Sequence, residues 1–312
     1  MELNDKIRGA LFGYALGDAL GVGTEFMSKS EAACYYPGGL RHFEDIIRDA
    51  HRSQWAPGEW TCDTEVIVRM AESVLRQGGF DVTDFAATLR DWCDEDPYDL
   101  CMPIRRCVGT PGWVNHPIAV THHVWMEVGT FEASNEALGR ALVTGMLSPR
   151  DTLDEDTRKA ILLTHDDSRC VSSATIMAHV VHELLHHDRE PEFDQLCDIC
   201  KDIDHRTLPY LEAARDKKLA DLEIDDEDTM NYTRKSMGAA LWALWHLDNA
   251  ADFIHLLVDE GGDADTNASL AGALAGIKYG YDALPAEKEK LLRRDYLHEL
   301  ADRIGEKIKE MR

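Results

Sequence analysis

The sequence predicts an all-α fold, and three observations support this prediction. Apolar side chains recur at helical spacing along most of the chain, segments that alternate like strands are scarce, and loops separate the helical segments. The chain has 312 residues, of which 44% are hydrophobic, so it has enough apolar surface for a buried core. Because we find no internal repeat and no Pro-, Gly- or Ser-rich linker, we expect one domain over residues 1–312.

Two of the expected helices carry glycine at every fourth position. These glycines are Gly9, Gly13, Gly17 and Gly21 in the first helix, and Gly272, Gly276 and Gly280 in the other. Glycine inside a helix costs about 1 kcal/mol relative to alanine, so a row of glycines on one face indicates a compensating gain. We expect a neighbouring backbone to approach closely there, which means tight helix packing in a rigid centre.

Six further segments show helical periodicity. They are residues 66–77, 84–92, 157–163, 171–187, 235–245 and 268–279. In the first of them, Val66, Met70 and Val74 recur on one face, and a pair of glycines ends the helix. Loops are expected at residues 53–60, 109–117, 148–151 and 260–265. We expect the chemistry of the protein to lie on such loops, at helix ends.

The chain is strongly acidic, because 58 Asp and Glu residues against 33 Lys and Arg residues give a formal charge of −25. Such a charge repels the phosphates of nucleic acids and anionic lipids, so we expect neither a nucleic acid nor a membrane as partner. The eight cysteines follow no disulfide framework, residues 1–8 do not lead into a signal peptide, and no run of about 18 apolar residues occurs. We therefore expect a cytoplasmic monomer with free thiols.

The sharpest local motif is GGDADT at residues 261–266. It places the oxygen-bearing side chains of Asp263, Asp265 and Thr266 just before a helix. Oxygen clusters of this kind suit hard cations such as Mg²⁺, Mn²⁺ or Ca²⁺. N-capping is the alternative explanation, because Asp caps helices well and its charge suits the helix dipole. An EF-hand is excluded, since Ala268 and Leu274 stand where that loop needs Gly and Glu.

Two other acidic motifs lie at helix ends. The segment WTCDT at residues 60–64 offers Thr61 and Asp63, with the thiol of Cys62 as a further candidate, before a helix, and by itself it too is explained by capping. The segment GDALG at residues 17–21, followed by Glu25 and Phe26, ends the first glycine-rich helix.

The three motifs together resemble the ADP-ribosylglycohydrolase family, of the dinitrogenase reductase-activating glycohydrolase type. That family opens with a G-x-x-x-G-x-x-x-GDALG helix and a Glu-Phe pair, continues with a W-T-D-D-T loop, and closes with GGDTDT or GGDADT followed by AGALAG. Residues 9–26, 60–64 and 261–276 match these motifs in the same order. Shorter similar stretches lie at residues 99–105, 134–140, 164–167 and 232–242, so that the resemblance spans residues 7–284.

The resemblance implies an orthogonal helical bundle with two divalent cations, Mg²⁺ or Mn²⁺, in a central cleft. It also implies hydrolysis of the glycosidic bond of an ADP-ribosylated protein or small molecule, with release of ADP-ribose. Carried over residue by residue, the metal ligands would be Thr61, Cys62, Asp63, Asp263, Asp265 and Thr266. The catalytic residues would be Asp99, as general base, and Glu25 beside the metals. The ADP-ribose site would be lined by Ser134, Asn135, His165 and Tyr232.

The sequence departs from the family pattern at three positions. Cys62 stands where the family usually has a carboxylate, and Cys101 and Glu136 stand where it usually has glycine. Because a thiol is a poor ligand for Mg²⁺, we expect one metal position to be weak, empty or softer in preference. These departures keep open a second hypothesis, a catalytically weakened ADP-ribose-binding protein of the same fold.

Three further motifs have simpler explanations. Residues 182–186 read HELLH, a literal H-E-x-x-H, which makes a zinc peptidase the distant alternative; because no third-ligand extension follows, we expect a solvated or partly packed helix face. Cys197 and Cys200 form a lone C-x-x-C with neither a second pair nor a thioredoxin-like context, and we interpret it as chance. The acidic run at residues 225–228 fits a solvated loop, or a loop that positions a cationic leaving group.

Overall fold

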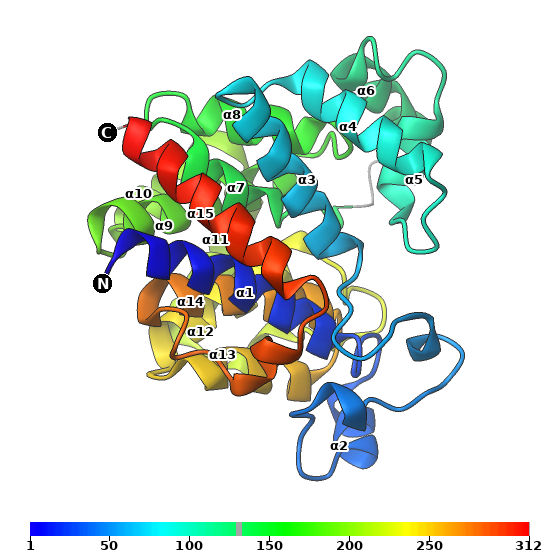
Figure 1. Cartoon of the computed structure of the whole chain (residues 1–312), viewed down its shortest axis with the longest axis vertical. Coiled ribbons are helices and arrows are strands. Elements are labelled where there is room, and N and C mark those ends of the chain that lie inside the picture. Colours follow the sequence, from blue (N-terminus) through cyan, green and yellow to red (C-terminus); the bar gives the residue numbers. More distant parts are fainter. Residues whose placement is uncertain (129–132, 312) are drawn as a thin grey trace. The chain divides into compact units, whose positions relative to one another are not determined.

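The computed structural model describes residues 1–128 and 133–311. This part of the chain contains fifteen α-helices and no assigned strand, so the predicted all-α class is confirmed (Figure 1). The described chain divides into two compact units. The first unit consists of Met1–Thr64 and Pro209–Gly305, and the second consists of Glu65–Leu208 and the residues from Glu306 onward. The expectation of a single domain stays a prediction, and each unit is described below by itself.

The first unit holds both ends of the sequence resemblance. Its helices are α1 (Leu3–Gly21), α2 (Lys29–Tyr35), α12 (Thr233–His246), α13 (Ala250–Glu260) and α14 (Ala264–Tyr279), with most of α11 (Leu208–Asp216) and α15 (Arg294–Met311). Its short 3₁₀ turns are η1 (Phe43–Asp45), η2 (Arg52–Gln54), η4 (Leu219–Leu222) and η5 (Ala286–Lys290). An isolated antiparallel bridge joins Met27 to Gly262.

Helices α1 and α14 pack antiparallel with their backbones in direct contact. A Cβ atom on Gly13 would lie 2.0 Å from the carbonyl oxygen of Gly272, and one on Gly9 would lie 2.2 Å from that of Gly276. No side chain larger than hydrogen fits at these contacts, which explains the glycines within the two helices. Gly280 differs from this expectation, because it follows the last residue of α14 as the C-cap, with a φ angle of +88°. The predicted close approach is therefore confirmed, and it brings the end of α1 beside the start of α14.

Helix α14 begins earlier than the sequence pattern indicated. Periodicity predicted a helix over residues 268–279, whereas the helix begins at Ala264, with Asp263 as its N-cap residue. Asp and Thr weaken the pattern because they are poor formers of helix interiors. In the first turn they are well tolerated, since a carboxylate there interacts favourably with the helix dipole. Asp265 and Thr266 thus belong to the helix itself and have fixed positions.

The second unit is built around one long buried helix. Its elements are most of α3 (Cys62–Gln77), then α4 (Val82–Asp94), α5 (Met102–Gly109), α6 (Pro117–Val128), α7 (Arg140–Leu147), α8 (Leu153–Leu162), α9 (Ser168–His187), α10 (Phe193–Ile203) and η3 (His205–Thr207). Helices α7, α8 and α10 pack against α9, which is buried from Cys170 to Leu185. Among the described residues, no helix has both the length and the apolar character needed to cross a membrane.

Candidate metal centre

A tight turn of two glycines sets the start of α14. Gly261 and Gly262 have φ angles of +74° and +71°, which L-residues with side chains rarely adopt. The turn is paired with the segment after α1, since Gly262 N donates to Met27 O at 2.7 Å and Phe26 N donates to Gly262 O at 2.8 Å. These two bonds fix the main chain next to Glu25 against the main chain next to Asp263.

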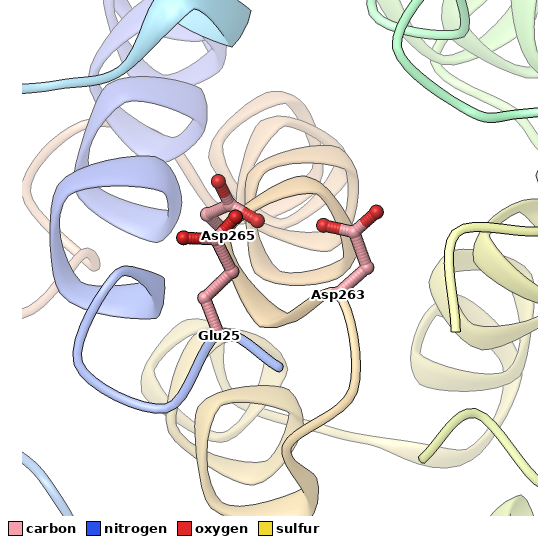
Figure 2. A group of neighbouring side chains, drawn as sticks. All are labelled: Glu25, Asp263 and Asp265. Atoms are coloured by element: carbon pink, nitrogen blue, oxygen red, sulfur yellow. The ribbon is translucent and has the colours of Figure 1, made fainter. Parts of the chain in front are cut away.

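Three buried carboxylates meet at this junction. Glu25, Asp263 and Asp265 are 8%, 6% and 6% exposed, and each offers a ligand atom within 4.8 Å of the other two. Figure 2 shows Glu25 on the turn after α1 and both aspartates at the start of α14. Burial, followed by the charges of Glu25 and Asp263, holds the pKa of Asp265 well above its ordinary value. Asp263 makes no capping hydrogen bond with its side chain, so capping does not explain that carboxylate.

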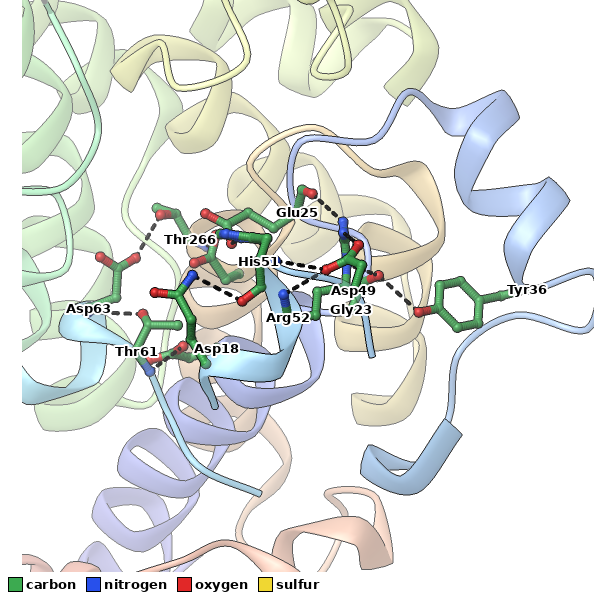
Figure 3. A network of polar contacts seen from close by, with 12 residues as sticks. Asp18, Gly23, Glu25, Tyr36, Asp49, His51, Arg52, Thr61, Asp63 and Thr266 are labelled. Atoms are coloured by element: carbon green, nitrogen blue, oxygen red, sulfur yellow. Dashed lines mark hydrogen bonds and ion pairs between the residues drawn. The ribbon is translucent and has the colours of Figure 1, made fainter. Parts of the chain in front are cut away.

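The WTCDT segment adjoins the same cluster. Thr266 Oγ1 donates to Asp63 Oδ2 at 2.6 Å, which joins two motifs 203 positions apart (Figure 3). Thr61 Oγ1 accepts a hydrogen bond from Asp63 N at 3.1 Å, the turn that starts α3. Cys62 is the first residue of α3, is 9% exposed, and forms no disulfide with a described residue. A chain of contacts therefore joins the other five predicted ligands, from Thr61 through Asp63, Thr266 and Asp265 to Asp263, and Cys62 lies between Thr61 and Asp63 in the sequence.

Asp18 organises the segment that carries Thr61 and Asp63. This aspartate is fully buried in α1, and its carboxylate accepts hydrogen bonds from Thr61 N at 2.9 Å, Thr64 N at 3.0 Å and Thr64 Oγ1 at 2.5 Å. Burial raises its pKa to about 7, although the bonds from Thr64 and Thr61 oppose that shift. The sequence marked Asp18 only as an acidic residue of the GDALG motif; its capping role depends on a contact between distant segments.

Two further residues near Glu25 lie outside every sequence motif. His51 Nε2 contacts Glu25 Oε2 at 2.7 Å, and the hydrogen bond with Glu25 raises the pKa of His51. Arg52 donates to the carbonyl oxygens of Gly23, at 2.9 Å, and Glu25, at 2.6 Å (Figure 3). No periodicity or spacing in the sequence pointed to either residue.

The donor set fits a hard divalent cation. Carboxylate and hydroxyl oxygens are the ligands that Mg²⁺ and Mn²⁺ prefer, and five of the six predicted side chains are of these types. Buried carboxylates of like charge repel one another, so a bound cation would relieve an unfavourable arrangement. Burial and this repulsion together raise the pKa of Asp265. Cys62 is the one soft donor in the set.

The second unit contains a separate group of predicted residues. His165 is fully buried, with Nδ1 2.8 Å from Thr164 Oγ1 and Nε2 3.1 Å from Ser134 Oγ. Glu136 Oε2 lies 3.3 Å from the same Nε2 atom. Burial alone would raise the pKa of Glu136, but the hydrogen bond and charge of His165 outweigh it and lower that pKa. Ser134 and His165 are thus neighbours, as the ADP-ribose-site hypothesis requires. Glu136, which stands where the family usually has glycine, is the third member of the group.

The other predicted residues have these positions. Asn135 is fully buried beside Ser134, and its main-chain carbonyl oxygen accepts a hydrogen bond from Leu138 N at 2.7 Å. Asp99 is half-buried in the segment before α5, within the second unit. Tyr232 is the N-cap residue of α12 in the first unit, and its ring centroid lies 5.7 Å from that of Tyr210. Their roles in substrate binding and catalysis stay predictions.

The H-E-x-x-H segment lies on a packed face of α9. His182 and Glu183 are 6% and 8% exposed, and the imidazoles of His182 and His186 are in contact, with centroids 4.5 Å apart and planes tilted by 42°. Glu183 is paired with Arg189 at 2.8 Å, and His186 Nε2 lies 3.0 Å from the carbonyl oxygen of Met146. These partners are typical of a structural helix face, and the clustered metal-ligating side chains among the described residues are the carboxylates of the first unit, not these histidines.

The two remaining motifs are structural as well. Cys197 and Cys200 lie on α10 without a disulfide to any described residue, and Cys200 is fully buried. The acidic run follows η4, and Asp225 Oδ2 accepts from Lys29 N at 2.9 Å. Next to it, the carbonyl oxygen of Ile224 would lie 2.1 Å from a Cβ atom on Gly262, so this loop touches the turn that starts α14.

Comparison with known proteins identifies the family of the chain. A family model for ADP-ribosylglycohydrolase matches residues 1–312. The chain is 26% identical over 319 residues to the ADP-ribosylarginine hydrolase Tri1 of Pseudomonas putida (strain GB-1), a match that covers 98% of this chain and 80% of that protein. It is 27% identical over 304 residues to the ADP-ribosyl-(dinitrogen reductase) glycohydrolase of Rhodospirillum rubrum, covering 91% of this chain and 89% of that protein. A solved structure, an ADP-ribosylglycohydrolase-related protein complex, superposes with a TM-score of 0.77 at 25% identity over 98% of this chain and 99% of that one. The chain therefore belongs to the ADP-ribosylglycohydrolase family.

Proposed function

We propose that the protein is a metal-dependent hydrolase that cleaves the bond between ADP-ribose and an arginine side chain of a modified protein. The observation that carries this proposal is the buried group of Glu25, Asp263 and Asp265, whose ligand atoms lie within 4.8 Å of one another. Membership of the family supports the reaction class, and similarity to an ADP-ribosylarginine hydrolase supports the arginine linkage.

Two divalent cations, Mg²⁺ or Mn²⁺, are the proposed cofactors. The residues that would hold them are Thr61, Cys62, Asp63, Asp263, Asp265 and Thr266, with Glu25 beside them. When bound, such cations orient the hydroxyl groups of a sugar and acidify a water molecule. They would also neutralise the carboxylates locally, so that an anionic substrate can approach a chain whose formal charge is −25.

The reaction adds water across the bond between C1″ of the ribose and a guanidinium nitrogen. Cleavage of such bonds passes through an oxocarbenium-like transition state, which a nearby carboxylate stabilises. We assign the proton of the attacking water to Asp99 as general base, with Glu25 as the carboxylate beside the metals. As the C1″–N bond breaks, its electron pair goes to the guanidine nitrogen, the water oxygen bonds to C1″, and the proton that Asp99 removes from the water passes to the guanidine, so that charge and atoms balance.

Binding of ADP-ribose is assigned to Ser134, Asn135, His165 and Tyr232. His165 has the firmest geometry of the four, because Thr164 and Ser134 contact its two ring nitrogens at 2.8 Å and 3.1 Å and fix its orientation. A ring held in this way presents a defined edge and loses little side-chain entropy when a ligand binds.

A specific observation favours a second candidate, an ADP-ribose-binding protein with weak turnover. Cys62 replaces a hard ligand among the metal-binding residues, and Glu136 adds a carboxylate 3.3 Å from His165. A carboxylate at that position would repel a pyrophosphate, and a thiol would weaken one Mg²⁺ position. Both effects reduce turnover more than they change the fold.

One experiment separates the two candidates. Purified protein is incubated with Mg²⁺ or Mn²⁺ and a panel of arginine-, serine- and O-acetyl-linked ADP-ribose substrates, and released ADP-ribose is measured. Release from the arginine-linked substrate that stops with EDTA is the expected result. Binding of ADP-ribose without release from any substrate would favour the second candidate.

Asp265→Ala is the variant that ties activity to the acidic cluster. Loss of a central carboxylate should abolish metal-supported turnover, whereas Asp282→Ala, which alters an exposed carboxylate, should leave turnover unchanged. Full activity of Asp265→Ala would rule out the proposed role of the cluster.

A further inference from the structure

Hydrogen bonds hold the turn that carries Glu25, which follows α1, on two sides. On the side of α13 and α14, Thr24 Oγ1 donates to Val258 O at 2.5 Å and Phe26 N donates to Gly262 O at 2.8 Å. Phe26 has a φ angle of +60°, a left-handed conformation that costs a residue with a side chain roughly 1–2 kcal/mol. Such a conformation persists only where the surroundings fix it, so the turn is held in one geometry.

The other side of the turn is held by Arg52, whose side chain is only 7% exposed. Its Nε atom donates to Gly23 O at 2.9 Å, and its terminal nitrogens donate to Glu25 O and to Asp49 Oδ2, each at 2.6 Å. Three acceptors in three directions match the planar fork of a guanidinium group. The Tyr36 hydroxyl also donates to Gly23 O, at 3.1 Å, so two side chains hold this carbonyl group.

The next contact concerns the Glu25 carboxylate itself. His51 Nε2 lies 2.7 Å from Glu25 Oε2, which leaves the second oxygen of the carboxylate for another partner. The imidazole is held between two rings, since its centroid lies 5.1 Å from that of Trp55 and 5.9 Å from that of Phe26. Asp49 Oδ1 also accepts from His51 N at 3.0 Å and Arg52 N at 2.8 Å, which fixes the segment carrying both residues.

We propose that His51 and Arg52 are positioning residues of the metal centre: Arg52 fixes the main chain on both sides of the Glu25 side chain, and His51 fixes its carboxylate. Figure 3 shows this arrangement, with the Asp49–Arg52 segment on the side of Glu25 away from Asp63 and Thr266. Outer-shell partners that orient a ligating carboxylate typically contribute about 10–100-fold to metal affinity. The inference rests on the proposed metal-dependent function, and it adds two residues that lie outside the sequence motifs described above.

Site-resolved metal binding tests the inference. Mn²⁺ and Mg²⁺ are titrated into the purified full chain by calorimetry, with electron paramagnetic resonance to count bound Mn²⁺. Arg52→Lys keeps the positive charge but loses the planar guanidinium group, and His51→Leu removes the imidazole donor. Each variant should lower the metal affinity of one site about 10–100-fold. His51→Gln keeps an N–H donor of similar reach and should restore most of the affinity.

The matched control is Arg41→Lys in the same unit. Arg41 also donates to a carboxylate and a main-chain carbonyl, at 2.7–2.8 Å to Asp259 and 2.7 Å to Leu40 O, but it does not contact the Glu25 turn. It should lower thermal stability without changing metal affinity. Equal metal affinity of wild type, Arg52→Lys and His51→Leu, or equal losses in Arg41→Lys, would overturn the inference while leaving the proposed function intact.

The proposed enzymatic function can be wrong while the positioning role of His51 and Arg52 is right. If wild type binds two metal ions, and the variants weaken one of them, but no ADP-ribosylated substrate is cleaved, the positioning role stands and the enzymatic proposal falls. If wild type binds neither Mg²⁺ nor Mn²⁺, metal dependence and the positioning role fall together.

Discussion

A Cβ atom on Gly21 would lie 2.3 Å from the Cα atom of Asp265. The last residue of α1 therefore touches the main chain that carries a proposed metal ligand, and no methyl group fits between them. At this contact the packing of the two central helices determines the geometry of the acidic cluster, because α1 cannot come closer to α14 without displacing Asp265.

Gly21→Ala should damage both stability and metal binding. Inserting a methyl group into a packed contact costs about 1–3 kcal/mol of unfolding free energy, and relief of the overlap would shift Asp265. Chemical denaturation and Mg²⁺ titration measure the two effects. Gly38→Ala is the control, since nothing lies within 4 Å of a Cβ atom there. Wild-type metal affinity in Gly21→Ala would show that the cluster tolerates movement of α1.

Cys62→Asp should raise Mg²⁺ affinity and Mg²⁺-supported turnover. The substitution gives a hard cation the carboxylate that it prefers to a thiol, at the first residue of α3. Without metal it adds charge to an acidic cluster, so the metal-free variant should melt at a lower temperature and gain more from Mg²⁺ than wild type does. Cys62→Ser controls for loss of the thiol. Two equally tight Mg²⁺ sites in the wild-type protein would show that the cysteine is harmless.

Asp18→Asn should loosen the start of α3. The carboxylate accepts three hydrogen bonds, from Thr61 N and from the backbone and hydroxyl of Thr64. An amide turns one acceptor into a donor that faces donors, and leaving buried groups unsatisfied costs about 1–3 kcal/mol. We expect a lower midpoint of denaturation and weaker metal binding, since Thr61 and Asp63 lose their support. An unchanged midpoint would mean that Asp18 is dispensable for this cap.

The pH dependence of stability should include a contribution from His182. Burial, followed by the charge of His186, lowers its pKa to about 4, so the unfolded state binds more protons than the folded state between about pH 4 and 6.5. Stability conferred by the neutral ring is therefore fully present above about pH 6.5 and is lost as the pH falls toward 4, at up to about 1.4 kcal/mol per pH unit.

His182→Gln should flatten that slope. The measurement is the unfolding free energy of wild type and variant at several pH values between 4 and 7. His123→Gln is the control, because that side chain is 71% exposed. The variant should keep wild-type glycohydrolase activity and metal content, and loss of bound zinc from it would revive the peptidase hypothesis.

Residues that belong to a recognisable short pattern could be identified from the sequence. The glycine rows predict that a neighbouring backbone approaches two helices closely, and the resemblance of three short motifs to the family implies which side chains meet at a metal. The segments 66–77, 84–92 and 171–187 are predicted as helices because their apolar faces repeat every three to four residues. For these helices the pattern and the structure that it predicts lie within the same few turns.

Residues whose meaning depends on a distant contact could not be found in this way. His51 and Arg52 lie in a segment without periodicity, and their partners belong to the turn after α1. Asp18 looks like an unremarkable acid within a helix until Thr61 and Thr64 are placed against it. A single sequence carries no sign of such pairings, since any of many polar residues could have supplied the same donors.

The contact between α1 and α14 also has a consequence for how the chain is made. Thr24 on the turn after α1 bonds to Val258, 234 positions further on, and Asp63 meets Thr266 across 203 positions. During synthesis α1 emerges long before α14, the helix that covers it, so these long-range contacts form late and slowly. Until then the nascent chain exposes a helix that is buried over most of its length in the folded protein. Self-repulsion by the acidic chain counters association of that helix with other chains.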